Sequence, residues 1–155
     1  MSNSKSTNQV EGVAIIGMAG RFPGAQNVAE YWRNLQNGVE SIGFFTDDEL
    51  KAAGVEPARL NAPNFIKAKG VIDNADEFDA AFFGFTPREA EIMDPQHRVF
   101  MECVWSALEA AGYDPESYDG AIGLFGGESM NTYLLFNLMS NRELLQSVGA
   151  LQASV

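Results

Sequence analysis

The side chains best suited to covalent chemistry lie within one predicted helix. Cys103 is the only cysteine and His97 the only histidine of this 155-residue chain. A catalytic cysteine needs a base or a helix N-terminus that lowers its pKa. Cys103 lies instead on the apolar face of a helix, where burial raises a thiol pKa, so we interpret it as a structural core thiol. The spacing also places His97 about 120° from Cys103 around the helix axis, which disfavours a catalytic pair.

His97 has too few acidic neighbours to predict a metal site. Such a site needs three or four converging ligands, and the sequence offers only Asp94 nearby. We therefore interpret His97 as a capping or packing residue. Paired carboxylates elsewhere fall in the first turns of predicted helices, where the helix dipole stabilises negative charge, so we interpret them as capping groups. These pairs are Asp47 with Asp48 and Glu89 with Glu91.

The glycines after the first apolar run could suggest a phosphate-binding loop. Gly17-Met18-Ala19-Gly20 does not fit G-x-G-x-x-G, however, and no G-K-[ST] follows it. Pro23 also interrupts the helix that would have to begin at the phosphate. A small α/β module that binds a nucleotide or another anion therefore remains only an alternative.

The elements that would position these residues alternate between short apolar runs and amphipathic segments. Residues 13–16 and 121–125 are apolar runs followed by glycine, as in strands buried on both faces of a parallel sheet. Phe65-Ile66 and Val71-Ile72 could form a hairpin. Helix signals begin at Asn27, Thr46, Thr86 and Asp94 and end at Gly38, Gly54 and Gly112.

The helix predicted from Pro95 to Gly112 has the clearest apolar period. Its Phe100, Val104 and Leu108 face is expected to pack against the sheet.

The two ends of the sequence differ in character. Residues 1–10 are mostly polar, and we expect a flexible leader there. Leu144, Val148, Leu151 and Val155 form an apolar helical stripe with no stop signal after it. Residues 11–155 are therefore expected to be an incomplete domain, and the stripe a surface for self-association.

Composition excludes several classes of partner. Ten basic and 21 acidic residues give a net charge of −11, which disfavours nucleic acid and anionic membrane surfaces. No apolar run is long enough to span a bilayer. A single cysteine cannot form an internal disulfide, so a reducing cytoplasm is the expected location.

Three stretches together resemble the start of a ketosynthase domain of the β-ketoacyl synthase family, of the type found in modular (type I) polyketide synthases. They are Val13–Ile42 (VAIIGMAGRFPGAQNVAEYWRNLQNGVESI), Phe78–Pro115 (FDAAFFGFTPREAEIMDPQHRVFMECVWSALEAAGYDP) and Ile122–Tyr133 (IGLFGGESMNTY). The resemblance implies a thiolase-like fold of the α/β class, with layered α/β/α architecture. This chain would hold only the first part of its N-terminal half.

The resemblance also implies an activity, namely decarboxylative Claisen condensation of carrier-bound acyl thioesters. The family's catalytic cysteine and histidines belong to segments that look like T-A-C-S-S, E-A-H-G-T-G-T and K-S-N-I-G-H, and none of these occurs here. No catalytic, cofactor-binding or metal-binding residue can therefore be assigned, and this chain alone is expected to be inactive. The parent enzyme would use phosphopantetheine on an acyl carrier protein and would form a homodimer. The alternatives are the anion-binding module and a non-catalytic self-association domain.

Overall fold

The structure, a computed structural model, describes residues 12–141 and residue 143. Five α-helices, one π-helix and one pair of short strands form in this part of the chain. In order they are α1 (Val28–Gln36), β1 (Gly43–Phe44), α2 (Asp47–Ala52), α3 (Pro57–Leu60), β2 (Ala68–Lys69), α4 (Pro87–Ile92), α5 (Pro95–Ala111) and the π-helix η1 (Leu134–Leu138). The predicted leader at residues 1–10 and the apolar stripe from Leu144 to Val155 lie outside the described residues.

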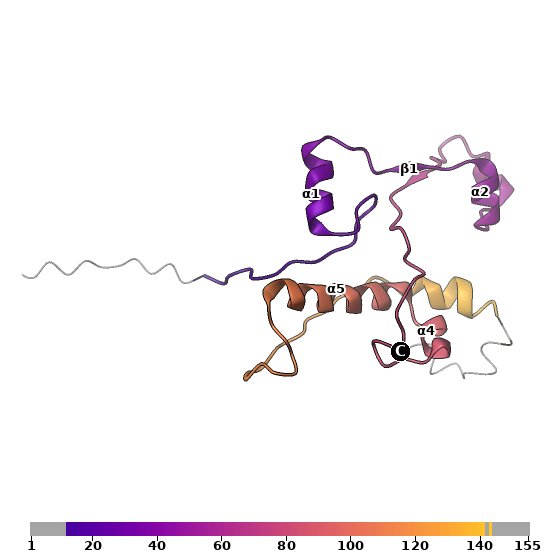
Figure 1. Cartoon of the computed structure of the whole chain (residues 1–155). Coiled ribbons are helices and arrows are strands. Elements are labelled where there is room, and N and C mark those ends of the chain that lie inside the picture. Colours follow the sequence, from indigo (N-terminus) through magenta and orange to yellow (C-terminus); the bar gives the residue numbers. More distant parts are fainter. Residues whose placement is uncertain (1–11, 142, 144–155) are drawn as a thin grey trace, which may run out of the picture.

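The longest helix, α5, forms the base on which other segments lie. The Asp94 side chain accepts a hydrogen bond from the Gln96 N–H at 2.8 Å, and Gly112 ends the helix in a left-handed conformation with φ of 73°. Both boundaries match the prediction. The chain before α1 and the chain after α5 each pass close to this helix, whereas β1, β2, α2 and α3 form a lobe away from it (Figure 1).

Two helices begin with the capping boxes that the sequence predicts. Thr46 Oγ1 accepts from the Glu49 N–H, and the Glu49 carboxylate accepts from the Thr46 N–H at 2.7 Å. Thr86 and Glu89 repeat this pair at the start of α4. The backbone donors of Thr46 and Thr86 stabilise the charged carboxylates, which lowers the pKa of Glu49 and of Glu89.

The start of α1 differs in one bond from the predicted capping box. Asn27 Oδ1 accepts from the Glu30 N–H at 2.9 Å, as expected. The Glu30 carboxylate, however, accepts from the N–H of Gln26 rather than from that of Asn27. The helix ends before Gly38, which adopts φ of 63°, so the predicted stop is confirmed.

The two predicted strands are absent from the described part of the chain. Residues 13–16 and 121–125 carry no strand assignment, and the side chains of Val13, Ile15 and Phe125 are exposed. A strand requires a neighbouring strand with which it can form hydrogen bonds. These two segments lead instead to Gly17 and Gly126, which pack against the helix α5. The prediction of buried strands is therefore wrong for this structure. An apolar run indicates that a segment tends to be buried, but it does not specify which other segment packs against it.

The hairpin predicted within residues 65–72 is also wrong. β2 pairs antiparallel with β1, with Gly43 opposite Lys69 and Phe44 opposite Ala68. The partner of this strand is thus more than twenty residues earlier in the chain. Local turn signals carry no information about such a distant pairing.

The core of the described chain is small. Leu138 of η1 packs with Ile92 of α4, and Tyr133 and Leu134 contact this pair. The expected packing of the α5 face against a sheet is not observed: Val104 and Leu108 are only half-buried, and Phe100 is 38% exposed. None of the described helices is both long and apolar enough to cross a bilayer.

Gly17 is required by the close passage of the chain across α5. A Cβ atom at this position would lie 2.4 Å from the carbonyl oxygen of Ala107. We expect Gly17→Ala to lower the free energy of unfolding by about 1–3 kcal/mol, because the contacted atoms are backbone that cannot move aside. Chemical denaturation would measure the change.

A matched control is Gly12→Ala, since nothing lies within 4 Å of the Cβ that it would introduce. We expect the free energy of unfolding of this variant to lie within about 0.5 kcal/mol of that of the original chain. Equal stability of both alanine variants would show that residue 17 does not lie against α5.

Candidate functional site

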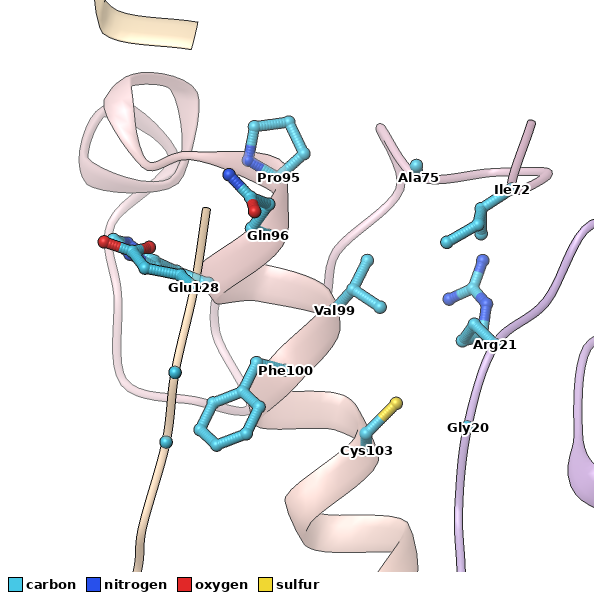
Figure 2. A pocket seen from close by; sticks show the side chains of 13 residues that line it. Gly20, Arg21, Ile72, Ala75, Pro95, Gln96, Val99, Phe100, Cys103 and Glu128 are labelled. Atoms are coloured by element: carbon cyan, nitrogen blue, oxygen red, sulfur yellow. The ribbon is translucent and has the colours of Figure 1, made fainter. Parts of the chain in front are cut away.

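A cavity lies along one side of α5 between two extended segments. It has a volume of about 650 Å³ and is lined mostly by apolar atoms. Val99, Phe100 and Cys103 of α5 form its floor, as Figure 2 shows. Gly20 and Arg21 border one side, together with Ile72 and Ala75. Gly126, Gly127 and Glu128 border the other side.

Cys103 faces this cavity rather than a closed core. The thiol is half-buried, and burial raises its pKa above the usual value. A backbone hydrogen bond to Arg21 and the positive charge of that residue act in the opposite direction, whereas the charge of Glu102 adds to the increase. The predicted direction of the shift is therefore found, but the predicted full burial is not. A thiol with a raised pKa is a poor nucleophile at neutral pH.

His97 contacts a residue of a distant segment of the chain, and no hydrogen bond between His97 and the Cys103 thiol is described. Its Nε2 atom pairs with the carboxylate of Glu128, from the segment that follows residues 121–125. The side-chain carbonyl oxygen of the adjacent Gln96 accepts from the Ser129 hydroxyl at 2.7 Å. The contacts of His97 and Gln96 thus connect residues 128–129 to the start of α5, and the interpretation of His97 as a capping or packing residue stays a prediction.

The paired carboxylates have structural partners. Asp47 forms an ion pair with Lys67, which lowers the pKa of Asp47 chiefly through the side-chain hydrogen bond. Asp48 pairs with Lys51 at 3.2 Å, and Glu91 pairs with Arg88 at 2.7 Å. Glu89 makes the capping bond described above, so the prediction of capping is confirmed for this residue. It is wrong for the other three: Asp47 and Asp48 lie in the first turn of α2 but bond to lysines, and Glu91 lies beyond the first turn of α4. Among the described residues, no group of three or more His, Cys, Asp or Glu side chains is placed to hold a metal ion.

The glycine loop at residues 17–20 has packing contacts in place of a phosphate-binding geometry. Gly17 lies against the backbone of α5, and Gly20 lies against the ring of Phe22. The next helix, α1, begins only at Val28, and the Asn27 side chain already caps it. The backbone contact explains Gly17 without a bound anion, so the nucleotide-binding alternative gains no support.

Sequence reasoning missed the polar residues that hold this site together. Arg21 bonds with Glu102, and Arg98 is buried with its guanidinium near residue 76. One signal was present: Arg21 lies in Val13–Ile42 and Arg98 lies in Phe78–Pro115, two of the three stretches on which the family resemblance rests. Their partners lie far away in sequence and could not be deduced from spacing.

Comparison with known proteins defines the class. The family model described as "Beta-ketoacyl synthase, N-terminal domain" matches residues 10–154. The chain therefore belongs to the β-ketoacyl synthase family, as the three sequence stretches predicted.

The similar proteins within this family are polyketide synthases. The chain is 50% identical over 131 residues to a phenolphthiocerol/phthiocerol polyketide synthase of Mycobacterium tuberculosis, covering 84% of this chain and 9% of that protein. It is 38% identical over 123 residues to polyketide synthase PksN of Bacillus subtilis, covering 79% of this chain and 2% of that protein. The chain thus spans less than a tenth of the length of these relatives.

Solved ketosynthases give the same assignment. The ketosynthase from module 6 of the bacillaene synthase of Bacillus subtilis is 39% identical, with a TM-score of 0.57, over 67% of this chain and 17% of that structure. The ketosynthase twelve from the bacillaene synthase of Bacillus amyloliquefaciens is 41% identical, with a TM-score of 0.55, over 62% of this chain and 17% of that structure. The predicted thiolase-like class and the polyketide ketosynthase assignment are therefore confirmed. The complete layered sheet is not formed by the described residues.

Proposed function

We propose that this chain provides the N-terminal scaffold of a polyketide synthase ketosynthase, a β-ketoacyl synthase-like acyltransferase. The complete domain would join carrier-bound acyl thioesters by decarboxylative Claisen condensation. The observation that carries this proposal is the family match over residues 10–154, combined with the likeness to solved ketosynthases at about 40% identity. Residues 11–155 would then form the N-terminal portion of the catalytic domain.

The chemistry of that reaction requires residues that this sequence does not contain. A cysteine thiolate accepts the acyl group and releases the carrier thiol. Loss of CO₂ from the extender unit then gives a carbanion that attacks the acyl-cysteine, forms the carbon–carbon bond and returns the thiolate. Cys103 does not suit this role, because its pKa is raised and no described base contacts it. We assign no catalytic residue to this chain.

The proposed partners follow from the same reaction. The acyl substrates would arrive as thioesters of phosphopantetheine on an acyl carrier protein, which supplies a mobile thiol for acyl transfer. The complete domain would act as a homodimer in the cytoplasm. None of the described residues is assigned to the carrier or to the dimer contact, and the net charge of −11 argues against a nucleic-acid partner.

A domain chimera tests the proposed function. The segment equivalent to residues 12–141 would be exchanged into the ketosynthase from module 6 of the bacillaene synthase. We expect the chimera to melt cooperatively, to take up one acyl group per chain and to form the condensed product, because the two segments are 39% identical and share a fold with a TM-score of 0.57.

The chimera allows a control on the chain's own thiol. Cys103→Ser in the exchanged segment is expected to leave acyl uptake and condensation unchanged, since another cysteine would carry the acyl group. A chimera that is folded and dimeric, yet takes up no acyl group, would contradict the proposed function.

A further inference from the structure

The turn at residues 73–76 is held by two arginines from widely separated parts of the chain. Arg21 donates through Nη2 to the carbonyl oxygens of Asp73, at 2.6 Å, and Asn74, at 3.3 Å. Arg98 of α5 donates through Nη1 to the carbonyl oxygen of Asp76 at 3.2 Å. Three of the four carbonyl groups of this turn therefore face a guanidinium group.

Each arginine is itself fixed in place. Arg21 Nη1 forms an ion pair with the Glu102 carboxylate at 2.9 Å, and the Arg21 side chain is only 16% exposed. Arg98 is a buried residue, 8% exposed. The Nε atoms of both arginines are buried without a hydrogen-bond partner among the described residues. Burial of these two N–H groups therefore carries a desolvation cost, which the other contacts of the side chains must offset.

The backbone of the turn is shaped to present its carbonyl groups. Asn74 adopts φ of 54°, and it is the only non-glycine residue with positive φ in the described part of the chain. Asparagine tolerates this left-handed conformation better than most residues. The carbonyl oxygens of Asp73 and Asn74 consequently reach the same Nη2 atom of Arg21.

We propose that Arg21 and Arg98 are positioning residues that act together as a two-arginine clamp on the turn at residues 73–76, and thereby set one side of the cavity over Cys103. The turn carries Ala75, and Ile72 precedes it, and both line the cavity beside Arg21 (Figure 2). Arg21 and Arg98 come from Val13–Ile42 and Phe78–Pro115, two of the stretches that carry the family resemblance, so the clamp gives those stretches a shared structural role. The proposal does not depend on the enzymatic function, because every contact lies within this chain.

Lysine cannot reproduce the contacts of Arg21, because its single ammonium group lacks the planar fork that contacts Glu102 and two carbonyl groups from separate nitrogen atoms. At Arg98, which makes one bond to the turn from a buried position, lysine would have to bury a more strongly hydrated ammonium group. Arg21→Lys and Arg98→Lys keep the charge and most of the aliphatic stem, which makes them suitable test variants. Arg33→Lys, at an exposed arginine of α1, is the matched control.

Hydrogen exchange of the 155-residue chain measures the clamp directly. Within residues 72–77, the one amide with a described hydrogen bond is that of Glu77, which donates to the Asn74 carbonyl oxygen at 3.2 Å. In each lysine variant we expect this amide to exchange about tenfold faster, the change expected for the loss of a charge-assisted hydrogen bond that holds the turn. Exchange within α1 should be unchanged, and Arg33→Lys should behave as the original chain. Because both arginines hold the same turn, their effects should not be independent. The increase in exchange rate in the double variant should therefore be much smaller than the product of the increases in the two single variants.

Thiol labelling supplies a second readout that general destabilisation would not reproduce. Cys103 would be labelled with a small reagent, iodoacetamide, and with a bulky pyrene maleimide. Release of the turn widens the cavity, so both clamp variants should raise the bulky-reagent rate more than the small-reagent rate. Global unfolding would raise both rates alike.

A variant of the turn itself keeps the test decisive if an arginine variant fails to fold. Asn74→Val disfavours the left-handed backbone and should speed exchange of the Glu77 amide, while Asn74→Gly should not. Exchange that is unchanged in folded Arg21→Lys and Arg98→Lys, fully independent effects of the two arginines, or equal behaviour of the two Asn74 variants would overturn the proposal.

Discussion

Replacing Leu138 with alanine is expected to lower the free energy of unfolding of the chain by about 2–5 kcal/mol. Leu138 is 3% exposed and packs against Ile92 in the main buried cluster of the described residues. The substitution removes apolar contacts and leaves a cavity. The site cannot readily collapse to fill that cavity, because the Tyr133 hydroxyl hydrogen-bonds the Glu91 carbonyl oxygen at 2.8 Å and fixes the π-helix to α4.

The matched control lies in the same π-helix. Leu135→Ala removes the same atoms from a residue that is 44% exposed. We therefore expect it to lower the free energy of unfolding by less than about 1 kcal/mol. Urea denaturation monitored by circular dichroism would measure both variants. Similar losses for the two leucines would mean that η1 does not pack on α4 through Leu138.

The helices of this fold are largely predictable because their signals are local. Thr46, Thr86 and Asp94 each bond to a backbone N–H within the next three residues, so the capping residue and its partner lie in one short window of sequence. Gly112 likewise ends α5 through its own left-handed conformation. Such features do not depend on distant parts of the chain.

The strands and the site required information that no local window contains. The apolar runs at residues 13–16 and 121–125 indicate surfaces to be covered, but hydrogen-bonded partners decide whether a strand forms. β1 and β2 pair across more than twenty residues, and local patterns predict neither of them. The contacts of Arg21 span 52 to 81 positions in the sequence, so its role became evident only from the structure.

For Cys103, the helical periodicity predicts part of the environment of the side chain but not all of it. The helical spacing places it correctly on an apolar face of α5, and burial does raise the pKa of its thiol. Periodicity could not show that this face borders an open cavity, since the sides of the cavity opposite α5 are formed by residues 20–21, 72, 75 and 126–128. The inference that Cys103 is unsuited to nucleophilic catalysis nevertheless stays a prediction that chemistry can test.

Acyl loading tests the central claim, that this chain is a ketosynthase scaffold without its own nucleophile. The 155-residue chain would be incubated with an acyl thioester donor, and its intact mass would be measured. We predict no acyl adduct on Cys103, because the thiol is mostly protonated near neutral pH and no described base contacts it. The active chimera described above serves as the positive control. Stoichiometric acylation of Cys103 in the chain alone, lost in Cys103→Ser, would contradict the account.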